Sequence, residues 1–163
     1  MSKQRAINTG PKSVVAVKRF EAYKSTWKRI NESIEDGYFL ESITLIESII
    51  SDRLEARIAI LNNQNHRSFL PLGDNVSILL GKNKKSRLNK ETDPGLITLL
   101  NKVDDWKKKR NEALHEMVKV PDSNALSWDD KYAESQSIAK EGIELARAVS
   151  NIIKKLNKLN KPV

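Results

Sequence analysis

Cysteine is absent from the 163 residues, which excludes disulfide bonds, thiolate metal sites and cysteine nucleophiles. Histidine occurs only twice, so the sequence predicts no imidazole-rich metal site and no metal ligands. No stretch reaches the roughly 18 consecutive apolar residues that a membrane span requires. The basic N-terminus is not followed by the apolar run of a secretory signal. We therefore expect a soluble, cytoplasmic protein with no membrane partner.

The chain carries more basic than acidic residues. The chain has 29 Lys and Arg against 21 Asp and Glu, a net charge of +8, which favours polyanionic partners over acidic proteins or neutral metabolites. Glycine and proline number only 6 and 5, and most of them stand where a helical pattern stops. The sequence also lacks a phosphate-binding loop, a dinucleotide-binding turn and a serine-hydrolase elbow, and it predicts no cofactor.

Apolar residues recur every three or four positions in five segments, as on one face of an α-helix. We expect helices at about residues 17–36, 38–62, 76–80, 94–117 and 129–159. No segment shows the alternation typical of a β-strand. The pattern predicts an all-α fold, an antiparallel bundle of four long helices plus a short one. This single domain, residues 17–163, follows a flexible polar tail, residues 1–16.

One charged residue interrupts the apolar stripe of the helix expected after Asp93. The stripe consists of Leu96, Leu99, Leu100, Val103, Trp106, Ala113, Leu114 and Met117. At about 100° per residue, Arg110 points along its centre. Because an unpaired buried charge is costly, Arg110 must meet a carboxylate, a phosphate or water. Two interpretations stay open: a structural ion pair with Glu47 or Asp52 of a neighbouring helix, or a guanidinium held beside a cleft for an anion.

The position of His115 raises a question of geometry. It lies five residues after Arg110, about 140° around an ideal helix, and so points away from the stripe. Asn111 and His115 are four residues apart and share one face. If both basic groups serve one site, either the helix loosens near residues 118–121 or the histidine face meets a second copy. The second option predicts a symmetric dimer with the site at its interface.

The string from Arg110 to His115, RNEALH, resembles the signature of the HEPN family (higher eukaryotes and prokaryotes nucleotide-binding domains). That signature is an arginine, four to six further residues and a histidine, often with asparagine directly after the arginine, as Asn111 is here. A helical bundle over nearly the whole chain also fits the family. The resemblance implies a metal-independent endoribonuclease, commonly a toxin or an antiviral effector. It further implies a homodimer whose two Arg/His pairs line one cleft, and an antitoxin or sensor partner.

The residues suit metal-free cleavage of RNA. The 2′-hydroxyl must lose a proton, the leaving 5′-oxygen must gain one, and the charge on phosphorus must be stabilised. Histidine exchanges protons near neutral pH, so His115 is the candidate general acid or base. Arg110 is the candidate ligand of the phosphate oxygens. Asn111 is expected to orient the imidazole or to bind a ribose or phosphate oxygen.

Two basic clusters are candidate contacts for the RNA backbone, with the alternative that each is simply a solvated face. One comprises Lys107, Lys108 and Lys109, directly before Arg110. The other lies in a loop that we expect to be mobile, and its main members are Lys84, Lys85 and Arg87. The alternative function is a catalytically inert helical module that binds RNA, a nucleotide or a protein. In that case Arg110 belongs to a structural ion pair.

Overall fold

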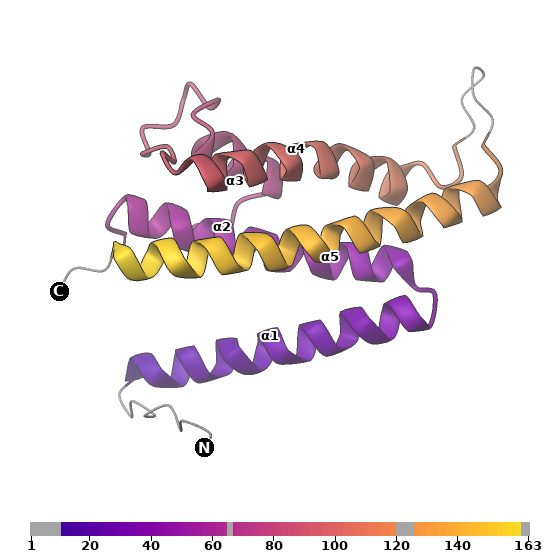
Figure 1. Cartoon of the computed structure of the whole chain (residues 1–163), viewed down its shortest axis with the longest axis horizontal. Coiled ribbons are helices and arrows are strands. Elements are labelled where there is room, and N and C mark those ends of the chain that lie inside the picture. The colour runs from indigo at the N-terminus through magenta and orange to yellow at the C-terminus, as the bar shows by residue number, and fades with distance from the viewer. Residues whose placement is uncertain (1–10, 65–66, 120–125, 161–163) are drawn as a thin grey trace.

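The computed structural model describes residues 11–64, 67–119 and 126–160. Within these ranges the chain forms helices and no strand. The helices are α1 (Pro11–Glu35), α2 (Phe39–Leu61), α3 (Leu72–Leu79), α4 (Pro94–His115) and α5 (Trp128–Leu159) (Figure 1). The predicted all-α fold of four long helices and a short one is confirmed. None of the described helices combines the length and the apolar character needed to cross a membrane.

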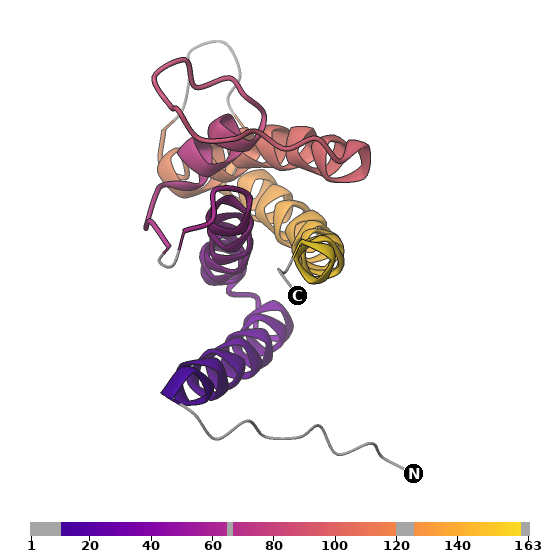
Figure 2. The same cartoon turned by 90° about the vertical axis from the view of Figure 1, so that its left-hand side faces the viewer.

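Helix α2 is the central element of the bundle. It packs against α1, α3 and α5, while α4 packs against α3 and α5 on the side away from α1 (Figures 1 and 2). Its apolar side chains at a spacing of three or four residues are completely buried: Ile43, Ile46, Ile50 and Leu54. Burial of this stripe on several sides explains why α2 has the most regular apolar pattern in the sequence.

The contact between α4 and α5 depends on one large and one small residue. Trp106 is completely buried, and its indole Nε1 donates a hydrogen bond to the carbonyl oxygen of Ile138 over 2.9 Å. A Cβ atom at Gly142 would lie only 2.7 Å from the Trp106 ring. The missing side chain at Gly142 therefore allows α5 to approach the indole closely. This contact fixes the half of α4 that carries the candidate site.

The starts of α4 and α5 follow local capping rules. Asp93 is the N-cap of α4, as predicted, and its carboxylate accepts a hydrogen bond of 2.8 Å from the Leu96 backbone N–H. Helix α5 begins at Trp128, one residue before the predicted start, because Ser127 and Asp130 form a capping box. Helix α4 ends at His115, two residues before its predicted end. His115 is thus the last helical residue.

The predicted flexible tail, residues 1–16, is wrong from Pro11 onward. Helix α1 begins at Pro11, six residues before the predicted start at Val17. Proline is well suited to the first helical turn because that turn needs no N–H donor and its φ is already helical. Residues 1–10 lie outside the described part of the chain. The extension lengthens α1 beyond the part that packs on α2, which leaves its first turns exposed.

Candidate functional site

Arg110 of α4 faces α2, as its position in the apolar stripe predicted. Its Nη2 donates a short hydrogen bond to Oε1 of Glu47, and its Nη1 donates one of 2.6 Å to Oδ1 of Asn111. The side chains of Arg110 and Glu47 are 13% and 23% exposed. The Nε of Arg110 is buried and has no acceptor among the described residues. Glu47, Arg110 and Asn111 therefore form one hydrogen-bonded chain from the partly buried contact between α2 and α4 to the exposed face of α4.

Glu47 is one of the two carboxylates expected to meet Arg110, and Asp52 is not involved. Asp52 instead accepts a 2.6 Å hydrogen bond from the Tyr23 hydroxyl and pairs with Arg67. Five residues separate the two carboxylates on α2, which turns them about 140° apart. Only one of them can face α4, so the assignment of Asp52 as a partner of Arg110 is wrong.

Burial affects the pKa of Glu47 more strongly than the ion pair with Arg110 does. Desolvation raises the pKa of Glu47 above its ordinary value, although the charge of Arg110 and its hydrogen bond act in the opposite direction. The Glu47 carboxylate is therefore partly buried at some cost in free energy. A buried pair of this kind is weak evidence for stability, and its more informative property is that it holds the guanidinium in place.

The exposed face of α4 carries the other two residues of the motif. Asn111 and His115 are both exposed, and the imidazole has no hydrogen-bond or ionic partner among the described residues. The helix is regular from Arg110 through His115. The chain has already left the helix at residues 116–119, but the helix is regular up to His115, so the loosening considered at residues 118–121 does not turn His115 toward Arg110 within the described residues. Pro121 and His66 lie outside them. In one chain, the imidazole and the guanidinium point in different directions, which leaves the dimer option.

The lysine run before Arg110 is tied to carboxylates of the protein itself. Lys107 and Lys108 pair with Asp104 and Asp105, one turn earlier, over 2.7 and 3.1 Å. Lys109 reaches Glu141 of α5 over 2.8 Å. These ion pairs reduce the positive charge that the run presents to a polyanion. An RNA backbone would have to compete with a carboxylate at each lysine.

The second basic cluster lies in the loop between α3 and α4 and is anchored to the bundle. The loop donates two hydrogen bonds from Asn89 to the end of α2, and the Glu91 N–H donates one to Leu79. Its side chains Lys84, Lys85 and Arg87 are exposed. Because α4 has 22 residues, this loop and His115 are separated by about 30 Å along the helix (Figure 1). The cluster and the motif do not form one compact site.

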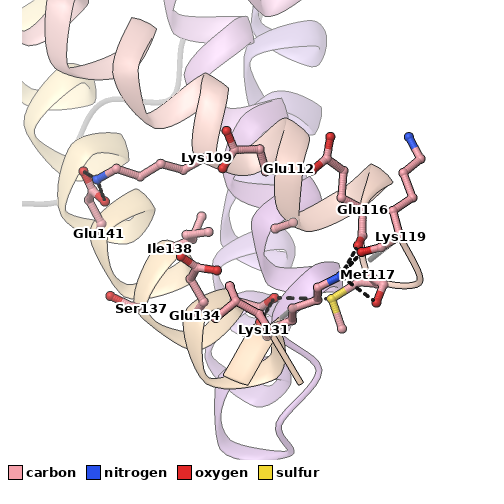
Figure 3. A pocket seen from close by; sticks show the side chains of 13 residues that line it. Lys109, Glu112, Glu116, Met117, Lys119, Lys131, Glu134, Ser137, Ile138 and Glu141 are labelled. Carbon is pink, nitrogen blue, oxygen red and sulfur yellow. Dashed lines mark hydrogen bonds and ion pairs between the residues drawn. The ribbon is translucent and has the colours of Figure 1, made fainter. Parts of the chain in front are cut away.

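A groove that sequence reasoning missed lies between the end of α4 and the start of α5, with a volume of about 450 Å³ (Figure 3). We call it the α4–α5 groove. Its lining includes the apolar side chains Ala113, Met117, Leu126 and Ile138. Four glutamates and three lysines surround them: Glu112, Glu116, Glu134, Glu141, Lys109, Lys119 and Lys131. No local pattern in the sequence indicates this groove, because its lining comes from the end of α4 and from the start of α5.

Lys131 connects the two walls of this groove. Its ammonium donates hydrogen bonds to backbone carbonyls at the end of α4, including Glu116 over 2.7 Å. A cation at this place satisfies carbonyls that the helix leaves without partners. The α4–α5 groove contains neither Arg110 nor His115. The groove and the motif thus lie on different sides of the same helix end.

Comparison of the chain with family models, with curated proteins and with solved structures gave no match. The fold and the site define a small helical bundle whose α4 carries an arginine, an asparagine and a histidine in its last two turns, with the arginine facing α2 and the histidine exposed.

The Glu47→Gln protein is expected to unfold at pH 7 with a free energy within about 1 kcal/mol of the original protein. The amide oxygen still accepts from Arg110, and the cost of burying a carboxylate is removed. Since the folded-state pKa of Glu47 is raised, the contribution of this carboxyl group to stability falls as the pH rises through that pKa, and the Glu47→Gln protein lacks this contribution. Urea denaturation between pH 4 and pH 7 measures both effects. A loss above about 2 kcal/mol would show that the ion pair itself stabilises the bundle.

Proposed function

We propose that this protein is a metal-independent endoribonuclease of the HEPN type that acts as a homodimer in the cytoplasm. The main support is the hydrogen-bonded chain from Glu47 through Arg110 to Asn111, which ends one helical turn before the exposed His115. A lone structural ion pair does not require an asparagine on the guanidinium or an accessible imidazole one helical turn after that asparagine. The positive net charge of +8 adds general attraction for RNA.

The proposed reaction uses three groups. His115 transfers a proton at the 2′-hydroxyl or at the leaving 5′-oxygen. Arg110 keeps one N–H on each Nη beyond its bonds to Glu47 and Asn111, and these two donors bind the phosphate oxygens as charge develops. Asn111 holds the guanidinium and offers its amide N–H groups to the substrate. The products are a 2′,3′-cyclic phosphate and a 5′-hydroxyl.

A second copy of the chain completes the proposed site. Because Arg110 and His115 are about 140° apart on α4, one copy does not direct both groups at the same phosphate. A homodimer that places the exposed end of α4 at its interface solves this problem. Such an enzyme would be harmful if it were unrestrained. We therefore extend the proposal to a toxin or phage-defence role, with an antitoxin or sensor protein as the restraining partner.

Incubation of the purified protein with total RNA in EDTA tests this function. We expect cleavage, because no metal takes part, and fragments with cyclic phosphate ends. DNA is expected to resist, because it lacks the attacking 2′-hydroxyl. Intact RNA at every protein concentration, or fragments with 5′-phosphate ends, would contradict the proposal.

The second candidate function is an inert module that binds RNA, a nucleotide or a protein. One observation favours it: Arg110 and the preceding lysines all have carboxylate partners within the protein. The same incubation separates the two functions, since this module would retain RNA in a filter-binding assay without shortening it. Its binding would weaken steeply with salt.

A further inference from the structure

Two arginines stack on aromatic side chains of α1. The guanidinium of Arg53, on α2, lies over the Tyr23 ring, with its Cζ 4.1 Å from the ring centroid. The guanidinium of Arg147, on α5, lies over the Trp27 ring at 5.5 Å. Both separations allow a cation–π attraction, which holds each guanidinium beside its ring without engaging a hydrogen-bond acceptor. We call these two stacked arginines the arginine pair.

Neither member of the arginine pair has an acidic partner. Arg53 and Arg147 form no hydrogen bond or ion pair with another described residue. By contrast, the other described arginines that are at least partly buried, Arg57, Arg67 and Arg110, each meet a carboxylate. The Nε of Arg53 is buried without an acceptor, so its two Nη groups are the donors left for an anion. A partly buried cation without a partner binds an incoming anion more strongly than a fully hydrated one does.

The side chains around Tyr23 carry an excess of positive charge. Asp52 accepts a hydrogen bond of 2.6 Å from the Tyr23 hydroxyl. The same carboxylate pairs closely with Arg67 and lies 4.0 Å from the Nε of Arg19. Together with Arg53, this cluster contains three guanidiniums and one carboxylate. Its charge therefore remains positive after the internal ion pairs are formed.

Two exposed glutamates are close in the sequence but do not neutralise the arginine pair. Glu21 stands two residues before Tyr23, which turns it about 160° away around α1. Glu144 lies one turn before Arg147 on α5, is exposed and forms no ion pair with it. Lys24 is exposed on α1 and adds a further unpaired positive charge. The side of the bundle formed by α1, α2 and α5 is thus available to an anion.

We propose that the arginine pair binds phosphates of a single RNA strand that crosses this side of the bundle. Tyr23 and Trp27 are one turn apart on α1, about 6 Å along its axis, a distance similar to that between successive phosphates of a strand. Because the rings already hold both guanidiniums, little side-chain freedom is lost when a phosphate binds. Arg53 and Arg147 therefore contact the backbone and read no base sequence.

An exposed aromatic residue next to the arginine pair favours RNA over an acidic protein. Phe20 is 68% exposed and lies on the same stripe of α1 as Tyr23 and Trp27. A positively charged surface with an aromatic ring on which a base stacks is the combination that binds single strands. Helix α1 lies on the side of α2 away from α4 (Figure 2). The arginine pair therefore holds a part of the strand other than the reacting phosphate.

Binding is measured with a labelled RNA strand whose 2′-hydroxyls are methylated, so that it binds without being cleaved. The protein with Arg53→Gln and Arg147→Gln is expected to bind this strand about tenfold more weakly or worse. Its plot of log affinity against log salt should be shallower by about 1.4, because each phosphate contact on a single strand contributes about 0.7 to the slope. Phe20→Ala should weaken binding about fivefold or more without changing the slope, since stacking releases no counterions.

Two further proteins control for net charge and for folding. The control with Arg29→Gln and Lys102→Gln loses the same two charges at exposed positions, one paired with Glu41 and the other on α4. It should bind within about twofold of the original protein, because neither position belongs to the proposed surface. Arg147→Gln alone changes an exposed side chain, so it is expected to fold and to bind about threefold more weakly. The melting temperature of each protein is measured by circular dichroism.

Three results would each overturn the proposal: no binding of the strand by the original protein, unchanged binding by the double arginine variant, or an equal loss in the charge control. Unchanged binding by both the double variant and Phe20→Ala would assign this side of α1 to a protein partner instead. The inference rests on the proposed function only for its substrate class, RNA. If the protein cleaves RNA, the double variant should raise KM and leave kcat unchanged. If it does not cleave, the methylated strand still decides whether the arginine pair binds RNA.

Discussion

Replacement of His115 by alanine is expected to lower the rate of RNA cleavage about 10²–10⁴-fold, the usual contribution of a general acid or base. The fold should not change, because the imidazole is exposed and has no partner among the described residues. Fragment release from a labelled RNA in EDTA measures the rate, and circular dichroism checks the helices. Asn101→Ala, an exposed position on the same helix, is the matched control and should cleave at the original rate.

A test of the role of Arg110 requires a substitution that keeps the positive charge beside Glu47. Arg110→Ala would leave the partly buried Glu47 without a partner and so mix a stability effect with a catalytic one. Arg110→Lys keeps a positive charge near Glu47 and removes the two-pronged donor for phosphate oxygens. We expect this protein to be folded and to cleave at least about tenfold more slowly. If the His115→Ala and Arg110→Lys proteins both cleave RNA at the original rate, the motif is not part of the active site.

The Glu91→Ala protein is expected to lose about 3–5 kcal/mol of unfolding free energy. Glu91 accepts two hydrogen bonds from Arg57, with the shorter measuring 2.6 Å between Nε and Oε2, and the side chains of Glu91 and Arg57 are 0% and 4% exposed. The Nη1 of Arg57 also donates to Asn157 in the last turn of α5 and to Asn160, the C-cap of α5, so the guanidinium connects α2, the loop before α4 and the end of α5. Removal of the carboxylate leaves this charge buried and unpaired.

Urea denaturation at pH 7 measures this loss of stability. Glu41→Ala is the control, because the Glu41 pair with Arg29 is similarly short at 2.7 Å but lies on the surface. We expect no measurable change there, since water already solvates both groups. Equal effects of Glu41→Ala and Glu91→Ala would contradict the importance given to burial.

The lowered pKa of Glu91 leads to the prediction that the fold loses stability in acid. Burial alone would raise the pKa of Glu91, but the hydrogen bonds from Arg57 and from the Asp93 and Thr92 backbone N–H groups lower it below its ordinary value overall. A lowered carboxyl pKa adds stability that is complete above about pH 4.3, the ordinary pKa of glutamate, and is lost as the pH falls through the folded value. Stability curves between pH 7 and pH 3 should therefore fall less steeply for Glu91→Ala than for the original protein.

Local patterns in the sequence were sufficient for the existence of the five helices and for much of the motif, although α1 and α3 begin six and four residues before their expected starts. The apolar spacing predicted each helix because a helix buries one face and repeats every 3.6 residues. Asp93 was predictable as an N-cap because capping depends on a side chain reaching a backbone N–H three residues away. Arg110 was identifiable because a charge in the middle of an apolar stripe requires a partner.

Contacts between distant residues were decided only by the tertiary structure. The choice of Glu47 over Asp52 depends on how α2 is rotated against α4, and no local pattern records that rotation. The pairing of Lys109 with Glu141 likewise depends on the close approach of α5 to Trp106. The α4–α5 groove exists because two helix ends meet there, and its carboxylates come from both of them.

The sequence by itself determined that this protein is a helical bundle carrying an arginine, an asparagine and a histidine near the end of α4, because periodicity and capping act over a few residues. The tertiary structure alone decided that Arg110 faces Glu47 while His115 faces solvent, and that the first turns of α1 extend beyond the part that packs on α2. These features depend on the packing angles and relative lengths of helices far apart in the chain, which side-chain contacts across the whole bundle determine.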